Sequence, residues 1–78
     1  MKENYRERFR ILGLKIAYYR KMRGMTQEQL AEAIGRSVSF VSQIEANNSA
    51  AVKGISLETL FLISDKLSVS MSRLFEDI

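Results

Sequence analysis

Residues 20–45, RKMRGMTQEQLAEAIGRSVSFVSQIE, contain two short helical patterns that are separated by a tight turn. Thr26 can cap the first helix, because its hydroxyl can accept from the backbone N–H of Gln29 while the Gln29 side chain reaches back to Thr26. Gly35 suits the end of this helix, and Ser37 can cap a second helix that begins at once. With only Gly-Arg-Ser between the two helices, the segment predicts a helix-turn-helix.

Apolar spacing outside this segment predicts three more helices and no strand. A helix from about Tyr5 to Arg23 carries one apolar stripe, formed by Phe9, Leu12, Ile16 and Tyr19. Ser56 and Ser70 are N-cap candidates for a fourth helix and for a short fifth helix from Met71 to about Asp77. The residues expected to face inward from the fourth helix are Leu57, Leu60, Ile63 (or Phe61 and Ser64) and Leu67. Residues 46–55, ANNSAAVKGI, have no stripe and are predicted to form a loop.

Length and composition limit the chemistry that the chain can perform. Its 78 residues make one small domain, in which residues 1–4 are expected to be loose. The absence of Cys and His excludes disulfides, thiolate nucleophiles, Cys/His zinc sites and imidazole acid–base catalysis, so we expect no cofactor, metal or small-molecule ligand. No apolar run is long enough for a membrane span, and the N-terminus does not resemble a signal peptide, so we expect a cytoplasmic protein.

Charge is distributed unevenly along the chain. Residues 1–24 carry eight Lys or Arg against two Glu, a net charge of +6, whereas residues 25–78 carry four cations against seven acids, a net charge of −3. Such asymmetry is typical of a polyanion partner, although a solvated basic helix has the same composition.

The segment from Arg20 to Glu45 resembles the helix-turn-helix of the Cro/C1-type (XRE) repressor family. The matching residues are Arg20, Gly24, Thr26-Gln27, Leu30-Ala31, Gly35, Ser37 and Ile44-Glu45, followed by Ser56–Leu60 and residues 67–75. Together they cover roughly residues 9–76. The resemblance implies an all-α, five-helix lambda-repressor-like domain over residues 1–78, with the helix-turn-helix at its second and third helices, and sequence-specific binding of double-stranded DNA.

This resemblance also implies roles for individual residues. In such folds the helix after Ser37 enters the major groove, so the expected base contacts are Val38, Ser39, Ser42 and Gln43. The alternative is that Val38 belongs to the core and that the serines are only solvated. The expected backbone contacts are Gln27, Arg36, Ser37, Phe40, Asn47, Asn48 and Lys53. Phe40 can instead fold back onto the preceding helix. The family further suggests an ion pair between Arg20 and Glu45 that fixes the recognition helix.

The predicted recognition helix contains no Arg or Lys, so a single subunit is expected to bind DNA weakly. We therefore expect a homodimer on a two-fold symmetric operator. Residues 71–78 are expected to contribute to its seam, which is predicted to contain Phe61, Met71, Leu74, Phe75 and Ile78. Small phage repressors and controller proteins of restriction–modification systems have this stand-alone form, and RNA polymerase or a second protein is a further candidate partner.

Two other function classes remain open from the residues alone. An antitoxin-like or antirepressor module, with weak or no DNA binding, would also have an uncharged recognition helix. An enzyme would need a catalytic group, and the candidate is the carboxylate pair Glu28 and Glu32, one helical turn apart. Solvated helix charges are far commoner than catalytic pairs, so we expect no enzyme.

Overall fold

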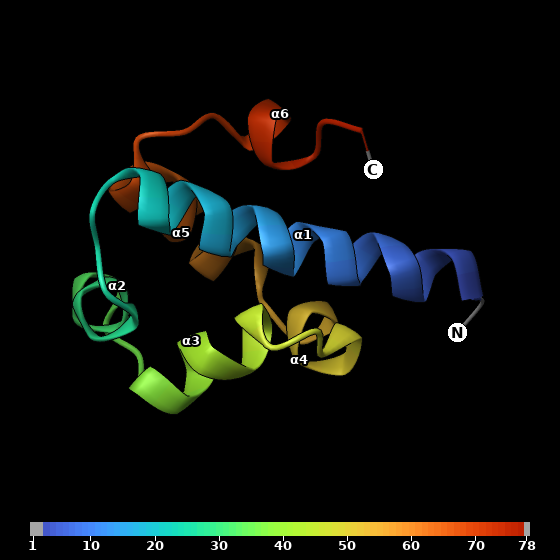
Figure 1. Cartoon of the computed structure of the whole chain (residues 1–78), viewed down its shortest axis with the longest axis horizontal. Helices are drawn as coiled ribbons and strands as arrows, with labels where there is room; N and C mark the ends of the chain where they lie inside the picture. Colours follow the sequence, from blue (N-terminus) through green and yellow to red (C-terminus); the bar gives the residue numbers. More distant parts are fainter. Residues whose placement is uncertain (1–2, 78) are drawn as a thin grey trace.

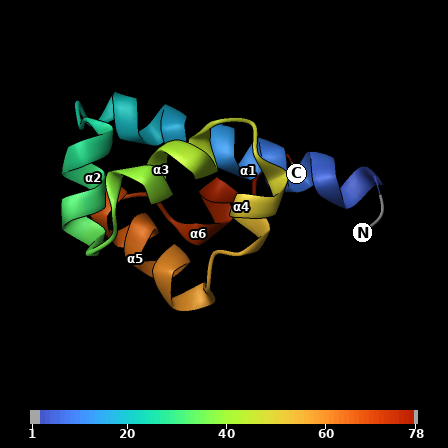
Figure 2. The same ribbon diagram turned by 90° about the horizontal axis from the view of Figure 1, so that it is seen from below.

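The computed structural model describes residues 3–77, and within that range it contains six helices and no strand. The helices are α1 Glu3–Met22, α2 Gln27–Ile34, α3 Val38–Glu45, α4 Ser49–Lys53, α5 Leu57–Leu67 and α6 Met71–Leu74. Helices α1 and α5 lie between α6 on one side and α3 with α4 on the other (Figure 1). The N-terminal part of α1 extends beyond the other helices (Figures 1 and 2). The all-α fold predicted from the sequence is confirmed.

Helix boundaries follow local capping chemistry. Each helix from α2 to α6 begins after a side chain that accepts a backbone N–H three residues on: Thr26, Ser37, Asn48, Ser56 and Ser70. The predicted capping box between Thr26 and Gln29 is present in full. Gly24 and Gly35 adopt left-handed φ angles of 71° and 69°, a conformation that glycine tolerates without strain and that ends α1 and α2.

The core is formed where one apolar stripe from each of the long helices meets. The fully buried large side chains are Ile16, Leu30, Val41, Ile44, Ile63, Leu67 and Leu74. The predicted α1 stripe is confirmed, since Leu12, Ile16 and Tyr19 are buried and Phe9 packs against them. Every buried side-chain N or O atom in residues 5–77 has a hydrogen-bond partner, so the core contains no uncompensated polar group in that range.

The prediction of a loop over residues 46–55 was wrong, because residues 49–53 form α4. The Asn48 side chain accepts from the backbone N–H of Ala51 and starts this helix. Val52 is its buried residue, packed in the same core as the α1 residues. A five-residue helix with a single buried apolar side chain shows no periodic stripe, so the sequence pattern could not reveal it. The part of the chain that the structure describes therefore has six helices, not five.

Three smaller expectations also need correction. Helix α1 includes residues 3 and 4, which were expected to be loose, while residues 1–2 lie outside the described range. Helix α6 ends at Leu74 rather than near Asp77. Leu57 does not face inward, since 69% of its surface is exposed. It occupies the first turn of α5, just outside the arc that buries Thr59, Leu60, Ile63, Ser64 and Leu67.

Candidate nucleic-acid interface

Helix α3 divides sharply into a buried side and an exposed side. Val41 and Ile44 are buried in the core, at 0% and 1% exposure. Ser39 and Gln43 are exposed, and Val38 keeps 42% of its surface in solvent. Figure 2 shows α3 across one face of the molecule, with α1 on one side of it and α5 on the other. Val38 is therefore not a core residue, and these three side chains are available to a ligand.

The polar side chains of α3 are partly organised by one another. The Gln43 side chain donates through Nε2 to Ser39 Oγ at 3.1 Å, so these two residues, one turn apart, form a pair on the exposed side. Ser42 is only half-exposed and donates to the Ser39 backbone carbonyl at 3.3 Å. Among the predicted base contacts, Ser39 and Gln43 therefore have the most accessible polar groups.

The N-terminal end of α3 is held by Arg36 and Phe40. The Arg36 guanidinium lies over the Phe40 ring, 4.2 Å from its centre, and Arg36 Nη1 donates to Thr59 Oγ1 of α5 at 3.5 Å. Phe40 is half-buried and packs against the core. A stacked guanidinium keeps its charge in solvent. Thr59, which sequence reasoning missed, thus helps to hold an exposed cation beside the α3 N-terminus.

The C-terminal end of α3 is held by Glu45. Arg20 donates to both Glu45 carboxylate oxygens, from Nε at 2.8 Å and from Nη2 at 2.9 Å, and its Nη1 donates to the Met25 carbonyl at 2.7 Å. The expected ion pair is therefore formed, and both of its side chains are less than 10% exposed. Gln27 Nε2 donates to Glu45 Oε1 at 3.0 Å. Through these contacts one carboxylate ties α3 to α1 and to the start of α2.

Gly13 brings α1 into backbone contact with α3. A Cβ atom at this position would lie 2.2 Å from the Ile44 carbonyl oxygen and 3.0 Å from a Val52 methyl group. Gly13 has helical neighbours on both sides and a negative φ. Glycine is therefore needed at this position because it has no side chain, not because of an unusual backbone conformation. Gly13 was not among the residues predicted from the sequence, although glycine inside an amphipathic helix indicates close packing.

The segment that follows α3 is ordered rather than loop-like. Asn47 has a left-handed φ of 59°, a conformation that Asn tolerates better than most residues. Asn48 uses its side-chain oxygen to cap α4, and Lys53 is exposed in the last turn of that helix. Both asparagines are exposed, so this turn and α4 extend the exposed face beyond Glu45. Ser37 accepts from the Phe40 backbone N–H and also remains exposed.

The predicted dimer residues do not form one patch. Leu74 is completely buried in the core of its own subunit, so its place in the seam was wrong, and Met71 is half-buried against that core. Phe61 and Phe75 are about half exposed, but they border different pockets. Phe61 lies beside Arg36 and Leu62, whereas Phe75 lies beside Tyr5 and Phe9. Ile78 lies outside the described residues.

Comparison with known proteins identifies the family. The helix-turn-helix family model matches residues 16–74. The chain is also 39% identical over 61 residues to an uncharacterized HTH-type transcriptional regulator of Bacillus subtilis (strain 168), YazB, and the match covers 74% of this chain and 88% of the relative. No solved structure gives a significant match. None of the helices in residues 3–77 combines the length and hydropathy that a membrane span needs. The chain therefore belongs to the Cro/C1-type (XRE) helix-turn-helix family of DNA-binding transcriptional regulators.

Proposed function

We propose that the protein regulates transcription as a homodimer that binds a two-fold symmetric DNA site, with α3 of each subunit in the major groove. The observation that carries the proposal is the division of α3. Val41 and Ile44 fix the helix in the core, while Val38, Ser39 and Gln43 project into solvent. The family is generally non-enzymatic, and the proposal gives no catalytic role to any carboxylate.

Base recognition rests on the exposed side of α3. Gln43 can form a bidentate pair with adenine once its hydrogen bond to Ser39 opens or is shared with the base. Ser39 can donate to or accept from several bases, and the Val38 side chain can pack on a thymine methyl group. Ser42 supports this surface from its half-exposed position. Because α3 carries no charge except Glu45, which is paired with Arg20, hydrogen bonding rather than net charge determines the sequence preference.

Contacts to the phosphate backbone surround α3. Arg36 keeps an exposed guanidinium at its N-terminal end, and Lys53 is exposed beyond its C-terminal end. Gln27 is the first residue of α2, where unpaired backbone N–H groups favour a phosphate. One N–H of the Gln27 amide is used by Glu45, which leaves the second for a phosphate oxygen. Ser37, Asn47 and Asn48 add exposed polar groups along the same face.

The exposed α5 residues Leu57 and Phe61 support a dimer seam. They lie one turn apart, with 69% and 53% of their surfaces in solvent. Burial of this pair against a two-fold related copy would remove the most exposed apolar side chains of α5 from water. A two-fold dimer of this family requires half-sites about one DNA turn, roughly 34 Å, apart.

Selection of bound fragments from random DNA duplexes tests the proposal directly. Purified protein should enrich a palindromic sequence, and the selected site should then bind in a salt-dependent manner in fluorescence anisotropy. If Arg36 and Lys53 of both subunits contact four phosphates, the slope of log K against log salt is expected to be about −3.6.

Three substitutions distinguish base-specific contacts from contacts to the phosphate backbone. Arg36→Ala should weaken binding to all sequences and reduce the salt slope, whereas Lys66→Ala, which removes an exposed cation of α5, should leave both unchanged. Gln43→Ala should lower discrimination at particular base pairs by about 1–3 kcal/mol. Failure to enrich any sequence, with binding that does not respond to salt, would instead favour the protein-interaction class.

A further inference from the structure

Helix α1 carries a second apolar stripe on the side that faces away from the core. Leu14, Tyr18 and Met22 follow one another at four-residue intervals and expose 45%, 58% and 55% of their surfaces. Ile11, half-exposed and one turn earlier, continues the row. We call these four residues the outer stripe. At about 1.5 Å per residue it runs for about 16 Å along α1, the length of a three-turn helix.

The outer stripe is bordered by positive charge. On the helical surface Lys15 lies along one edge of the stripe, and Lys21 and Arg10 lie along the other. Arg10 is already paired with Glu7. Its hydrogen bond holds the pKa of the Glu7 carboxyl below the ordinary value, so this pair is neutral at pH 7. Lys15 and Lys21 remain as the cations that set the sign of the surface.

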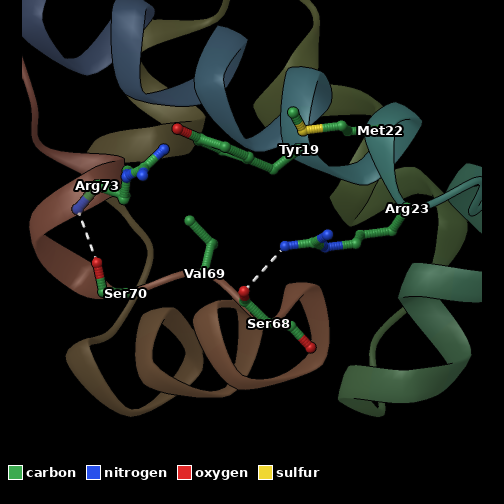
Figure 3. Close-up of a pocket in the computed structure, with 7 residues that line it drawn as sticks. All are labelled: Tyr19, Met22, Arg23, Ser68, Val69, Ser70 and Arg73. Carbon is green, nitrogen blue, oxygen red and sulfur yellow. Dashed lines mark hydrogen bonds between the residues drawn. The ribbon is translucent and has the colours of Figure 1, made fainter.

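A pocket of about 380 Å³ adjoins the C-terminal end of the stripe, where Met22 belongs to both. Tyr19 of α1 and Val69, from the segment after α5, line it from facing sides, and Arg23 and Arg73 enter from the other two sides (Figure 3). Arg23 is held in place because it donates to the carbonyls of Leu67 and Ser68, at 2.6 and 3.0 Å. The pocket thus combines an apolar lining with two guanidinium groups. Like the outer stripe, it is an apolar surface bordered by positive charge.

We propose that the outer stripe and this pocket form a docking surface for an acidic amphipathic helix from a second protein. Such a helix would lay apolar side chains, spaced three and four residues apart, on Leu14, Tyr18 and Met22. Its carboxylates would face Lys15 and Lys21 along the edges and the arginines of the pocket. A second copy of this chain is a poor occupant of the surface, because it would bring the same cations together.

The docking surface is separate from the surfaces assigned to DNA and to the dimer. Helices α1 and α5 lie on opposite sides of α3 (Figure 2). A partner on the outer face of α1 therefore leaves Ser39 and Gln43 exposed, together with Leu57 and Phe61. In a dimer joined through α5, each subunit would present its own docking surface. This arrangement allows a neighbouring DNA-bound protein to be engaged while the site is occupied.

Fluorescence anisotropy with designed peptides tests the surface. The probe is a labelled helical peptide of about 16 residues, with leucines at helical spacing and glutamates between them. One control peptide has the same composition in scrambled order, and a second has lysine in place of every glutamate. The full-length protein should bind the first peptide at least fivefold more tightly than either control. Equal binding of the three peptides would overturn the proposal.

Matched variants locate the binding. Lys21→Glu should weaken the acidic peptide about fivefold, whereas Lys66→Glu should not, although both replace an exposed cation in the last turn of a helix. Leu14→Gln should also weaken the peptide, whereas Leu57→Gln should leave the peptide affinity unchanged and shift the assembly toward monomers. The proposal fails if Lys21→Glu and Lys66→Glu, or Leu14→Gln and Leu57→Gln, change the peptide affinity equally. It also fails if the protein binds anionic phospholipid vesicles in a way that depends on Lys21 but binds the peptide in a way that does not.

DNA binding is measured in the same samples. Lys21→Glu and Leu14→Gln should retain the affinity and sequence preference of the unchanged protein for the selected duplex. Competition between peptide and duplex would show that the peptide occupies the DNA face, which would overturn the docking surface without affecting the proposed regulator function. Loss of duplex binding in every sample would reject the regulator function alone.

Discussion

Replacement of Gly13 by alanine has two opposite effects on the free energy of unfolding, one from helix propensity and one from packing, and the structure indicates that the packing effect is larger. Alanine is favoured over glycine inside a helix by about 1 kcal/mol. The new Cβ would lie 2.2 Å from the Ile44 carbonyl oxygen, a backbone atom that cannot rotate away. Overpacking of a core typically costs about 1–3 kcal/mol, and a contact this short belongs at the upper end. The expected net loss is about 2 kcal/mol, a fall in Tm of roughly 8–16 °C for a domain of this size.

Thermal and urea unfolding followed by circular dichroism measure this loss, and Gly54→Ala is the matched control. Gly54 has φ −80° and ψ −3°, and a Cβ there would meet no atom closer than 3.5 Å. The control should therefore be neutral or more stable by about 0.4–1 kcal/mol. Because the strain in Gly13→Ala acts on the last turn of α3, its affinity for the selected duplex should also fall. A Gly13→Ala protein as stable as the control would refute the close approach of α1 and α3.

Three further tests concern the contacts that hold the helices together. Glu45→Ala leaves the Arg20 guanidinium buried without its partner and should cost about 3–5 kcal/mol in denaturant unfolding; a second change, Arg20→Met, should restore part of that loss. Arg23→Ala removes the donors to the Leu67 and Ser68 carbonyls and should cost about 1 kcal/mol. Leu74→Ala should cost about 2–5 kcal/mol, whereas Phe75→Ala removes a half-exposed side chain and should cost only about 1 kcal/mol. Equal losses for the last two would contradict the burial of Leu74.

The helix-turn-helix was predictable because its signals are local. The capping box at Thr26, the left-handed Gly35 and the Ser37 cap each act within four residues of the chain. The same is true of Ser56 and Ser70, which start α5 and α6 where expected. Helix α4 has an equally good local signal in Asn48, but the missing apolar period concealed it. Capping residues were therefore more reliable than hydrophobic spacing for helices of five residues or fewer.

Burial at the C-terminus was less predictable, because it depends on where α6 packs rather than on local pattern. Leu74 and Phe75 are adjacent and similarly apolar, yet one is completely buried and the other is 46% exposed. The sequence could indicate an apolar cluster in this region, but it could not divide that cluster between a core and an interface. The same reason explains Leu57 and Phe61, whose exposure follows from the angle at which α5 meets the core.

For the candidate site, the residue types were more predictable than their contacts. The Arg20–Glu45 pair was expected from the family resemblance, and the structure forms it. The contact of Arg36 with Thr59, and that of Gln27 with Glu45, join residues 23 and 18 positions apart. No periodic pattern links such pairs, so they become visible only when the helices are placed in space. Gly13 is the exception, since a glycine within a predicted amphipathic helix already indicates a close neighbour.

The arrangement of charge around α3 is compatible with the proposed recognition of DNA bases by a helix that has no cation. The one charge on α3, Glu45, is neutralised by Arg20 and used to orient the helix. The nearest exposed cation, Arg36, stacks on Phe40 at the other end and lies outside the reading surface. In the proposed function, general attraction to DNA therefore comes from residues that flank the helix, and discrimination comes from the neutral, hydrogen-bonded pair Ser39 and Gln43. Because neutral side chains gain little from non-specific sites, this division favours a high ratio of specific to non-specific binding over high affinity. Under the proposed function a second subunit would add the affinity that one reading helix lacks, and the exposed Leu57 and Phe61 are the proposed surface for it.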